Sequence, residues 1–212
     1  LAVEDVKARS QNYLSFLLPG LLAFTLMQLA IAGSGFNIVE YRRKGILKRL
    51  FVTPIKPRDF ITAIVLARTV LILVQLAVLL SLATYMGGVT IVGSVLAFFS
   101  VVLVTTFLFL CLGFFLGSLA KTQQSIMALG NLVIFPQAFL SGIFYPIESM
   151  PAFLQPIAQL LPLSFATTAM REIANNGAAL IDIVPTLVGL CTWLLVAFFI
   201  ATRFFVWKEV AK

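Results

Sequence analysis

Residues 40–59 read EYRRKGILKRLFVTPIKPRD, and long apolar runs flank this stretch on both sides. It holds seven of the fifteen Lys and Arg residues of the protein. Short loops rich in Lys and Arg are retained on the cytoplasmic side of a membrane, whereas apolar segments of about 20 residues cross the hydrocarbon. The stretch is therefore predicted to be a cytoplasmic loop between two membrane spans.

Apolar side chains within this loop recur at helical spacing, and its cations fall largely elsewhere on the helical wheel. The apolar residues are Ile46, Leu47, Leu50 and Phe51. The pattern predicts a short amphipathic helix over residues 40–52 that lies along the inner face of the membrane. Pro54 ends it, because the residue before a proline is pushed out of the α region. A solvated basic loop that only fixes the topology is the alternative.

The composition excludes a water-soluble domain. Of the 212 residues, 61% are hydrophobic and 11% are charged, which is typical of a polytopic membrane protein. The net charge of +7 follows from the asymmetry of the loops, so no nucleic-acid partner is expected. Both cysteines lie inside apolar runs and there is no histidine, so no metal site is predicted.

Five apolar runs are long enough to cross a membrane and predict an all-α fold. They cover residues 13–39, 60–86, 91–119, 125–144 and 183–205. This arrangement places twelve Lys and Arg inside and only Lys7, Arg9 and Arg171 outside, as the positive-inside rule requires. The chain starts at Leu1 with an odd number of spans, so a further span upstream is expected, giving six in the full protein.

Few polar side chains interrupt the spans. Arg68 and Gln75 lie seven residues apart on one helix face, and polar side chains commonly bond between helices in membranes, so helix packing explains them best. Gly113 and Gly117 form a GxxxG spacing that lets two helix backbones approach closely. The candidates for contact with a ligand are Gln28, Gln75 and Asn131.

Prolines at positions 146, 151, 156 and 162 divide an apolar segment into pieces too short to span a membrane. We predict that residues 145–162 form two short helices that dip into the outer leaflet and return. The alternative is an amphipathic loop that rests on the lipid surface. Residues 164–181, which include Arg171 and an Asn-Asn-Gly turn, are predicted to lie outside.

The chemistry of an enzyme is absent from the sequence. There is no GxxxxGK[ST] phosphate loop and neither an HExxH nor a GxSxG motif. The spans hold no paired carboxylates, and Glu148 and Asp182 are isolated acids at the predicted outer surface. No catalytic residue is therefore predicted.

Two stretches carry a resemblance to a known family. Residues 40–54, EYRRKGILKRLFVTP, and residues 135–151, FPQAFLSGIFYPIESMP, continuing to Leu161-Pro-Leu163, are similar to the membrane subunit of type-2 ATP-binding-cassette (ABC) exporters. That group includes bacterial drug, polysaccharide and lipo-oligosaccharide export permeases. Residues 12–20 also resemble the family's entry to its second span. The resemblance covers nearly the whole chain.

The resemblance implies a single transmembrane domain over residues 1–212 that works as a dimer, with itself or a related permease, in a bacterial inner membrane. A cassette ATPase would bind the inner face and hold ATP and Mg²⁺, with no cofactor in this chain. The loop at residues 40–59 would carry the coupling helix, with Glu40, Arg43, Lys44, Gly45, Leu47, Lys48, Leu50 and Phe51 as candidate ATPase contacts. The outer gate would include Phe144, Tyr145, Pro146, Glu148 and Pro151.

The leading hypothesis is a non-enzymatic permease subunit of an ATP-driven exporter. One alternative is a channel or secondary transporter without an ATPase, which would carry charges near the membrane midplane, where only Arg68 comes close. Another is a membrane scaffold whose basic helix binds anionic lipid.

Overall fold

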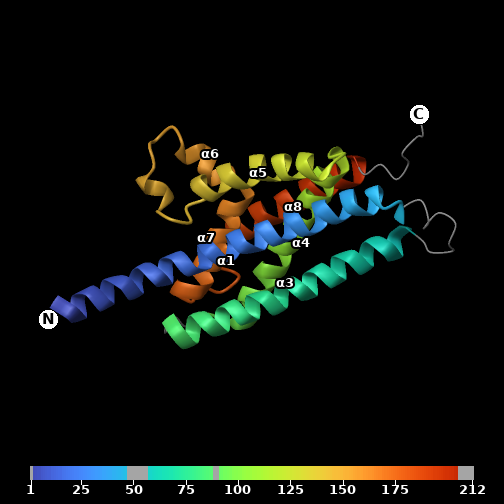
Figure 1. Cartoon of the computed structure of the whole chain (residues 1–212). Coiled ribbons are helices and arrows are strands. Elements are labelled where there is room, and N and C mark those ends of the chain that lie inside the picture. Colours follow the sequence, from blue (N-terminus) through green and yellow to red (C-terminus); the bar gives the residue numbers. More distant parts are fainter. Residues whose placement is uncertain (1, 47–56, 88–90, 205–212) are drawn as a thin grey trace.

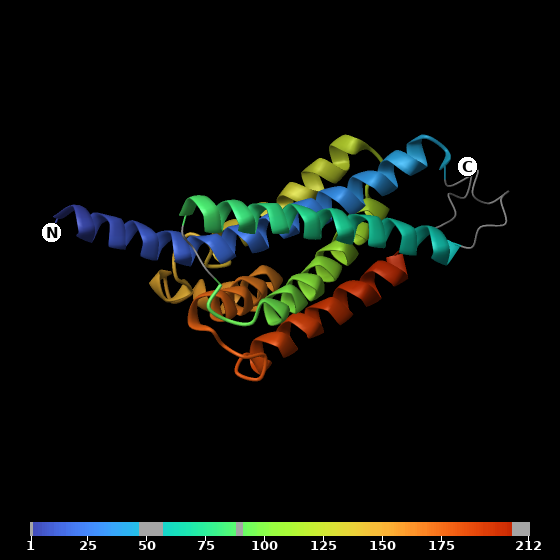
Figure 2. The same cartoon turned by 90° about the horizontal axis from the view of Figure 1, so that it is seen from below.

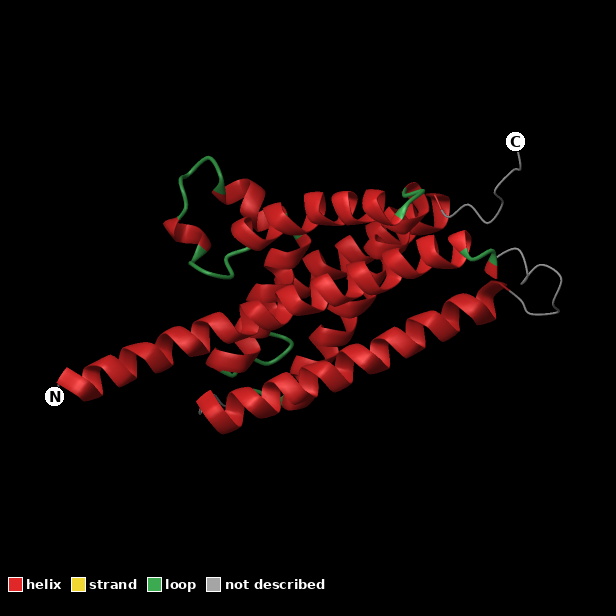
Figure 3. Ribbon diagram, in the orientation of Figure 1, coloured by secondary structure: helices red, strands yellow, loops and turns green. Residues whose placement is uncertain are grey.

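The computed structural model describes residues 2–46, 57–87 and 91–204, which form a bundle of helices (Figure 1). Figure 3 shows helices joined by loops, with no strand among these residues. The predicted all-α class is therefore confirmed. The helices are α1 (Ala2–Arg43), α3 (Pro57–Gly87), α4 (Val95–Leu119), α5 (Gln123–Leu140), α6 (Gln155–Leu160), α7 (Pro162–Asn176) and α8 (Val184–Phe204), with a 3-10 turn at Ile147–Ser149.

Four helices in the described part of the chain are long and apolar enough to cross a membrane. The segments are Ser15–Arg43, Thr62–Tyr85, Val95–Leu119 and Val184–Arg203. The fifth predicted span corresponds to α5, which has 18 residues and is not among the four. At about 1.5 Å per residue, α5 covers about 27 Å, slightly less than a hydrocarbon core of roughly 30 Å. The helix ends early because the chain turns at Gly142, whose φ is +69°.

The helices alternate in direction, as the charge pattern predicts. Figure 1 places the ends of α1, α4 and α8 together with the beginnings of α3 and α5. We call this the basic end, because Arg42, Arg43, Lys44 and Lys121 belong to it. The N-terminus, the end of α3 and both α6 and α7 lie at the opposite end. That the basic end faces the cytoplasm stays a prediction.

A seam of small residues joins α1 to α4. A Cβ atom added at Gly113 would collide with the Ser34 hydroxyl, and one added at Gly117 would lie 2.9 Å from the Gly35 carbonyl oxygen. The Ser34 hydroxyl lies 3.2 Å from the Leu110 carbonyl oxygen of α4. The GxxxG spacing therefore serves helix packing within this chain. On its other side α4 packs against α8 (Figure 2).

The proline-rich region differs from the prediction of two short helices within residues 145–162. That segment contains only the 3-10 turn and α6, and the longer α7 begins at its last proline. Proline suits this first helical position because its missing N–H has no helical partner there. α7 then runs to Gly177, whose φ of +67° ends the helix. Whether this region dips into a membrane stays a prediction.

α7 belongs to the core of the bundle, and its predicted place on the outer side of the membrane stays a prediction. It turns one apolar face inward, and Leu163, Ala166, Met170 and Ile173 are all fully buried. The helix contacts α1, α4, α5 and α8. Residues 164–176, expected only to lie outside, thus pack against most of the bundle.

α1 is longer than the predicted span over residues 13–39. It continues without interruption through Pro19 and extends to Arg43, over 42 residues. The predicted amphipathic helix over residues 40–52 is therefore wrong at its start, because residues 40–43 are the last turn of α1. Most of that predicted helix, including Leu47, Lys48, Leu50 and Phe51, lies outside the described residues.

Candidate functional site

The end of α1 is set by Gly45. The backbone N–H of Lys44 donates to the Glu40 carbonyl at 2.9 Å, and that of Gly45 donates to the Arg42 carbonyl at 3.1 Å. Gly45 has a φ of +66°, a conformation that glycine adopts without the steric cost other residues incur. A Cβ atom added there would have no heavy atom within 4 Å. Gly45 is thus needed to turn the chain, and its predicted contact with a partner stays a prediction.

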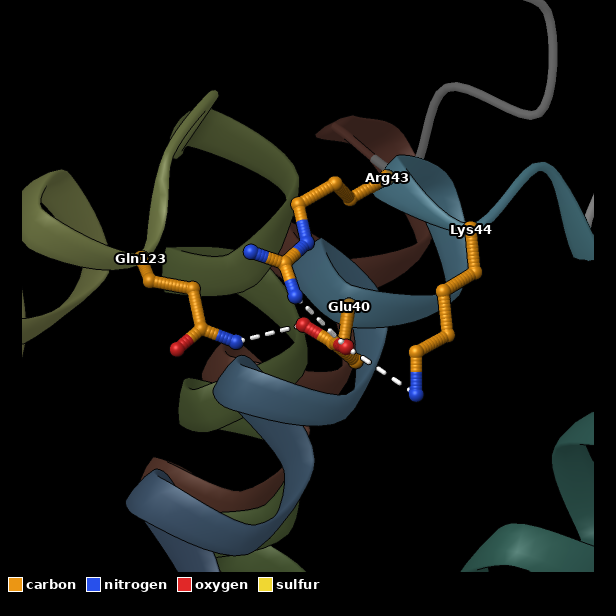
Figure 4. A network of polar contacts seen from close by, with 4 residues as sticks. All are labelled: Glu40, Arg43, Lys44 and Gln123. Atoms are coloured by element: carbon orange, nitrogen blue, oxygen red, sulfur yellow. Dashed lines mark hydrogen bonds and ion pairs between the residues drawn. The ribbon is translucent and has the colours of Figure 1, made fainter.

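A polar network links the last turn of α1 to the start of α5 (Figure 4). The Glu40 carboxylate lies 3.0 Å from Nη2 of Arg43 and 3.1 Å from Nζ of Lys44. The Gln123 amide donates to the same carboxylate at 2.6 Å. The Glu40 side chain is 21% exposed, whereas those of Arg43 and Lys44 are 68% and 60% exposed. Glu40 is therefore the shielded centre of this network.

A second contact joins the same elements through the backbone. Nη1 of Arg42 donates to the Ala120 carbonyl at 3.1 Å, just after α4 ends. Gln123 is held in place by a capping box, in which Thr122 Oγ1 accepts from the Ser125 N–H at 3.1 Å and Ser125 Oγ accepts from the Thr122 N–H at 3.0 Å. We call Glu40, Arg42, Arg43, Lys44, Ala120 and Gln123 the basic-end junction. It ties α1 to the connection between α4 and α5.

A groove of about 210 Å³ lies between α1 and α5. Two of the three predicted ligand contacts, Gln28 and Asn131, line it from opposite helices. Gln75 is exposed on α3 and does not belong to the groove. The remaining wall is mostly apolar and includes Ile31, Phe36, Met127 and Ile134. The groove can accept an apolar group and has two amide side chains in its wall.

Arg68 packs between helices, as its position suggested. A Cβ atom added at Gly33 of α1 would lie 3.2 Å from both Cδ and Nη1 of Arg68. The glycine therefore leaves room for the arginine side chain to lie across α1. This contact favours helix packing over the charged midplane site that a channel or secondary transporter would need.

The predicted gate residues lie in the bend between α5 and α6. Phe144 and Tyr145 are 39% and 42% exposed. The bend is held by backbone bonds, including Ser149 N–H to the Pro146 carbonyl at 3.0 Å. It is also held by the Gln155 amide, which donates to the Met150 carbonyl at 2.9 Å. The bend thus presents two aromatic side chains at the end of the molecule opposite the basic end.

Two residues of α7 that the sequence analysis did not include among the candidate site residues also contact α1. Arg171 and Asn175 are four residues apart, and both donate to backbone carbonyls of α1. Burial lowers the pKa of the Arg171 guanidinium below its ordinary value, and the charges of Glu148 and Glu172 partly offset this. The signal for α7 was present in the sequence. Pro162 and Gly177 bracket apolar residues at helical spacing, as expected for a capped amphipathic helix.

Comparison with known proteins gives a consistent result. Residues 3–174 match the family model described as "ABC-2 type transporter". The chain is 30% identical over 171 residues to the linearmycin resistance permease protein LnrN of Bacillus subtilis, covering 80% of this chain and 43% of that protein. It is 30% identical over 154 residues to the inner membrane transport permease YhhJ of Escherichia coli, covering 72% of this chain and 41% of that protein.

A third relative is less similar in sequence, but the match covers a larger share of its length. The daunorubicin resistance ABC transporter permease protein DrrB1 of Streptomyces coeruleorubidus is 24% identical over 180 residues, covering 82% of this chain and 62% of that protein. The chain thus spans between 41% and 62% of the length of these relatives. The family model covers most of the chain, including the basic-end junction, the groove and the predicted gate residues. The chain is a multi-pass membrane protein that belongs to the ABC-2 type transporter family.

Proposed function

We propose that this chain is the transmembrane permease part of an ATP-driven exporter in a bacterial inner membrane. A cassette ATPase binds the basic end and holds ATP and Mg²⁺, and a second copy of the chain or a related permease completes the path. The family supports this proposal, since relatives carry the names of drug-resistance and transport permeases.

The observation that carries the proposal is the basic-end junction. In the sequence, the predicted coupling segment continues from the last turn of α1, which the junction ties to the connection between α4 and α5. A force applied to this segment by an ATPase would therefore reach three helices together. Such a force is useful only if the bundle has two states that both sites can bias.

The groove between α1 and α5 is the proposed part of the substrate path. Its apolar wall suits an amphiphile, and the amides of Gln28 and Asn131 supply hydrogen bonds that orient it. Because the groove borders α1 and α5, any shift between these two helices changes its width. Transport would follow from such a shift.

A double substitution in the loop tests the proposal. Leu47→Asp with Leu50→Asp places two charges on the apolar face of the predicted coupling helix. We expect the variant to insert normally, to lose copurification of the ATPase, and to export nothing in membrane vesicles. The matched control is Lys56→Ala with Arg58→Ala, which lies beyond Pro54, leaves the predicted coupling helix intact and should retain the ATPase. Unchanged ATPase binding in the Asp variant would refute the coupling role.

A further inference from the structure

Pro19 lies inside α1 and leaves one carbonyl of that helix without its usual donor. Proline has no N–H, so the carbonyl four residues earlier, that of Ser15, receives no helical hydrogen bond. An unsatisfied carbonyl in apolar surroundings is costly, and helices commonly kink at proline. α1 nevertheless continues through Pro19. A donor from elsewhere in the molecule is therefore needed.

That donor comes from α7. The Asn175 amide donates to the Ser15 carbonyl at 2.9 Å. One turn earlier on the same face, Nε of Arg171 donates to the Phe16 carbonyl at 3.3 Å, and the guanidinium lies 3.8 Å from the centre of the Phe16 ring. Two side chains of one helix thus hold α1 at the point where proline weakens it.

Arg171 also holds a third element. Its Nη2 donates at 3.0 Å to the carbonyl of Gly142, in the bend after α5. Gly20 makes this close arrangement possible, since a Cβ atom added there would lie 3.2 Å from the Ile143 Cα and 3.4 Å from Nη2 of Arg171. One guanidinium therefore joins α7, α1 and the bend that carries the predicted gate residues. We call this arrangement the α1–α7 junction, which comprises Ser15, Phe16, Pro19, Gly20, Gly142, Arg171 and Asn175.

From Gly20 to Arg43, α1 is one continuous helix of about 35 Å at about 1.5 Å per residue. We propose that Arg171 and Asn175 are positioning residues for transport. They hold α1 against bending at Pro19, so that a displacement at the basic end is carried past Pro19 to Phe16 and, through Arg171, to the Gly142 carbonyl in the bend beside Phe144. Without them, bending at Pro19 absorbs the displacement. This proposal rests on the proposed export function.

The test measures whether ATP changes the exposure of the bend. The full-length protein with its ATPase is reconstituted in liposomes after Cys111→Ala, Cys191→Ala and Phe144→Cys. The readout is the rate at which a membrane-impermeant maleimide labels position 144, with ATP and vanadate and without nucleotide. In this parent we expect the rate to depend on nucleotide.

Asn175→Ala is expected to abolish that dependence while the ATPase remains bound and active. The matched control is Asn176→Ala, the next residue of α7, whose side chain donates to Glu172 of its own helix at 2.7 Å. This control should behave as the parent. Arg171→Lys provides a second test, independent of how well Asn175→Ala folds. A lysine keeps the charge but lacks the fork that reaches two carbonyls, so the dependence should also fall.

Pro19→Ala separates positioning from general stability. The new alanine N–H can satisfy the Ser15 carbonyl, and the helix no longer bends readily there. Asn175→Ala should then have little effect, so the double variant should recover the nucleotide dependence. An equal loss with and without Pro19 would overturn the proposal, and so would full dependence in both Asn175→Ala and Arg171→Lys. A parent with no nucleotide dependence overturns the export function itself, and the positioning role with it.

Discussion

Polar side chains tie α1 to neighbouring elements at two places, its basic end and the region of Pro19, but the two sets of contacts satisfy different needs. At the basic end, Glu40 gathers two exposed cations and the Gln123 amide. Around Pro19, Arg171 and Asn175 donate to carbonyls of α1, one of which lacks its helical donor because proline has no N–H. The basic-end junction consists mainly of charged side chains. The α1–α7 junction supplies a hydrogen-bond donor that the backbone of α1 lacks at Pro19.

The difference indicates which contacts hold the fold. Exposed ion pairs contribute about 0–1 kcal/mol, because water and salt screen the charges. A polar group that loses its hydrogen-bond partner costs about 1–3 kcal/mol where no water can replace the partner. The α1–α7 junction should therefore matter more for stability. The basic-end junction can rearrange at low cost, which suits a surface that meets a partner.

The largest effect is expected from Arg171→Ala. The change removes donors to Phe16 and Gly142 and a cation–π contact, so the free energy of unfolding should fall by about 2–4 kcal/mol. Unfolding by denaturant in mixed micelles measures it. Arg203→Ala, at an exposed position in the last turn of α8, is the control and should cost little. A loss below about 1 kcal/mol for Arg171→Ala would remove the contrast between the two junctions.

Two glycines extend the comparison of the two junctions. Gly20 leaves space for its neighbours, whereas Gly45 adopts a φ that other residues rarely adopt. Gly20→Leu should destabilise the protein by about 1–3 kcal/mol, since its side chain meets Ile143 and Arg171. Gly45→Ala meets no neighbour and should cost only about 1 kcal/mol, through its φ of +66°. The same unfolding measurement compares them. If Gly45→Ala is the more damaging change, the basic end is more tightly constrained than its contacts indicate.

Gln123→Leu tests the link between α1 and α5. The substitution removes the hydrogen bond to Glu40 but leaves the carboxylate its two cations, so the cost should be about 1 kcal/mol. Thermal melting in detergent at low and high salt measures the effect. Gln124→Leu is the matched control, since that side chain is exposed on the same helix turn. Equal effects of the two substitutions would argue against the link.

The smallest effect is expected from Arg43→Ala. Its side chain is 68% exposed and pairs with Glu40 three residues earlier, so the change in unfolding free energy should stay below about 0.5 kcal/mol. The small difference should vanish as salt is raised, because salt screens exposed charges. A cost above about 1 kcal/mol that persists in high salt would place Arg43 among the structural residues.

The sequence predicted most of the spans because hydropathy is a local property. The predicted runs at residues 60–86, 91–119 and 183–205 differ by only a few residues from α3, α4 and α8. It did not predict where α1 ends, because an apolar periodicity continues across Gly45. Nor did it identify α7 as a helix, because prolines and polar residues around 162–177 drew attention to turns.

Only two of the three predicted ligand contacts lie in one groove, because their positions depend on how the helices pack. Gln28 and Asn131 are 103 positions apart, and only helix packing brings them to one groove. Gln75 carries the same type of side chain but faces away on α3. The type of side chain identified the candidate ligand contacts, but only the placement of the helices shows which of them share a groove.

The sequence by itself determined that this is an all-α membrane protein with one strongly basic loop, because composition and charge fix how segments partition between lipid and water. Only the tertiary structure decided how Pro19 is tolerated in the middle of α1. The donor that Ser15 needs lies on Asn175, 160 residues away, and a hydrogen bond across that separation depends on the packing of α7 against α1. The local sequence indicates which backbone groups need a hydrogen-bond partner, and the fold determines which side chain supplies it.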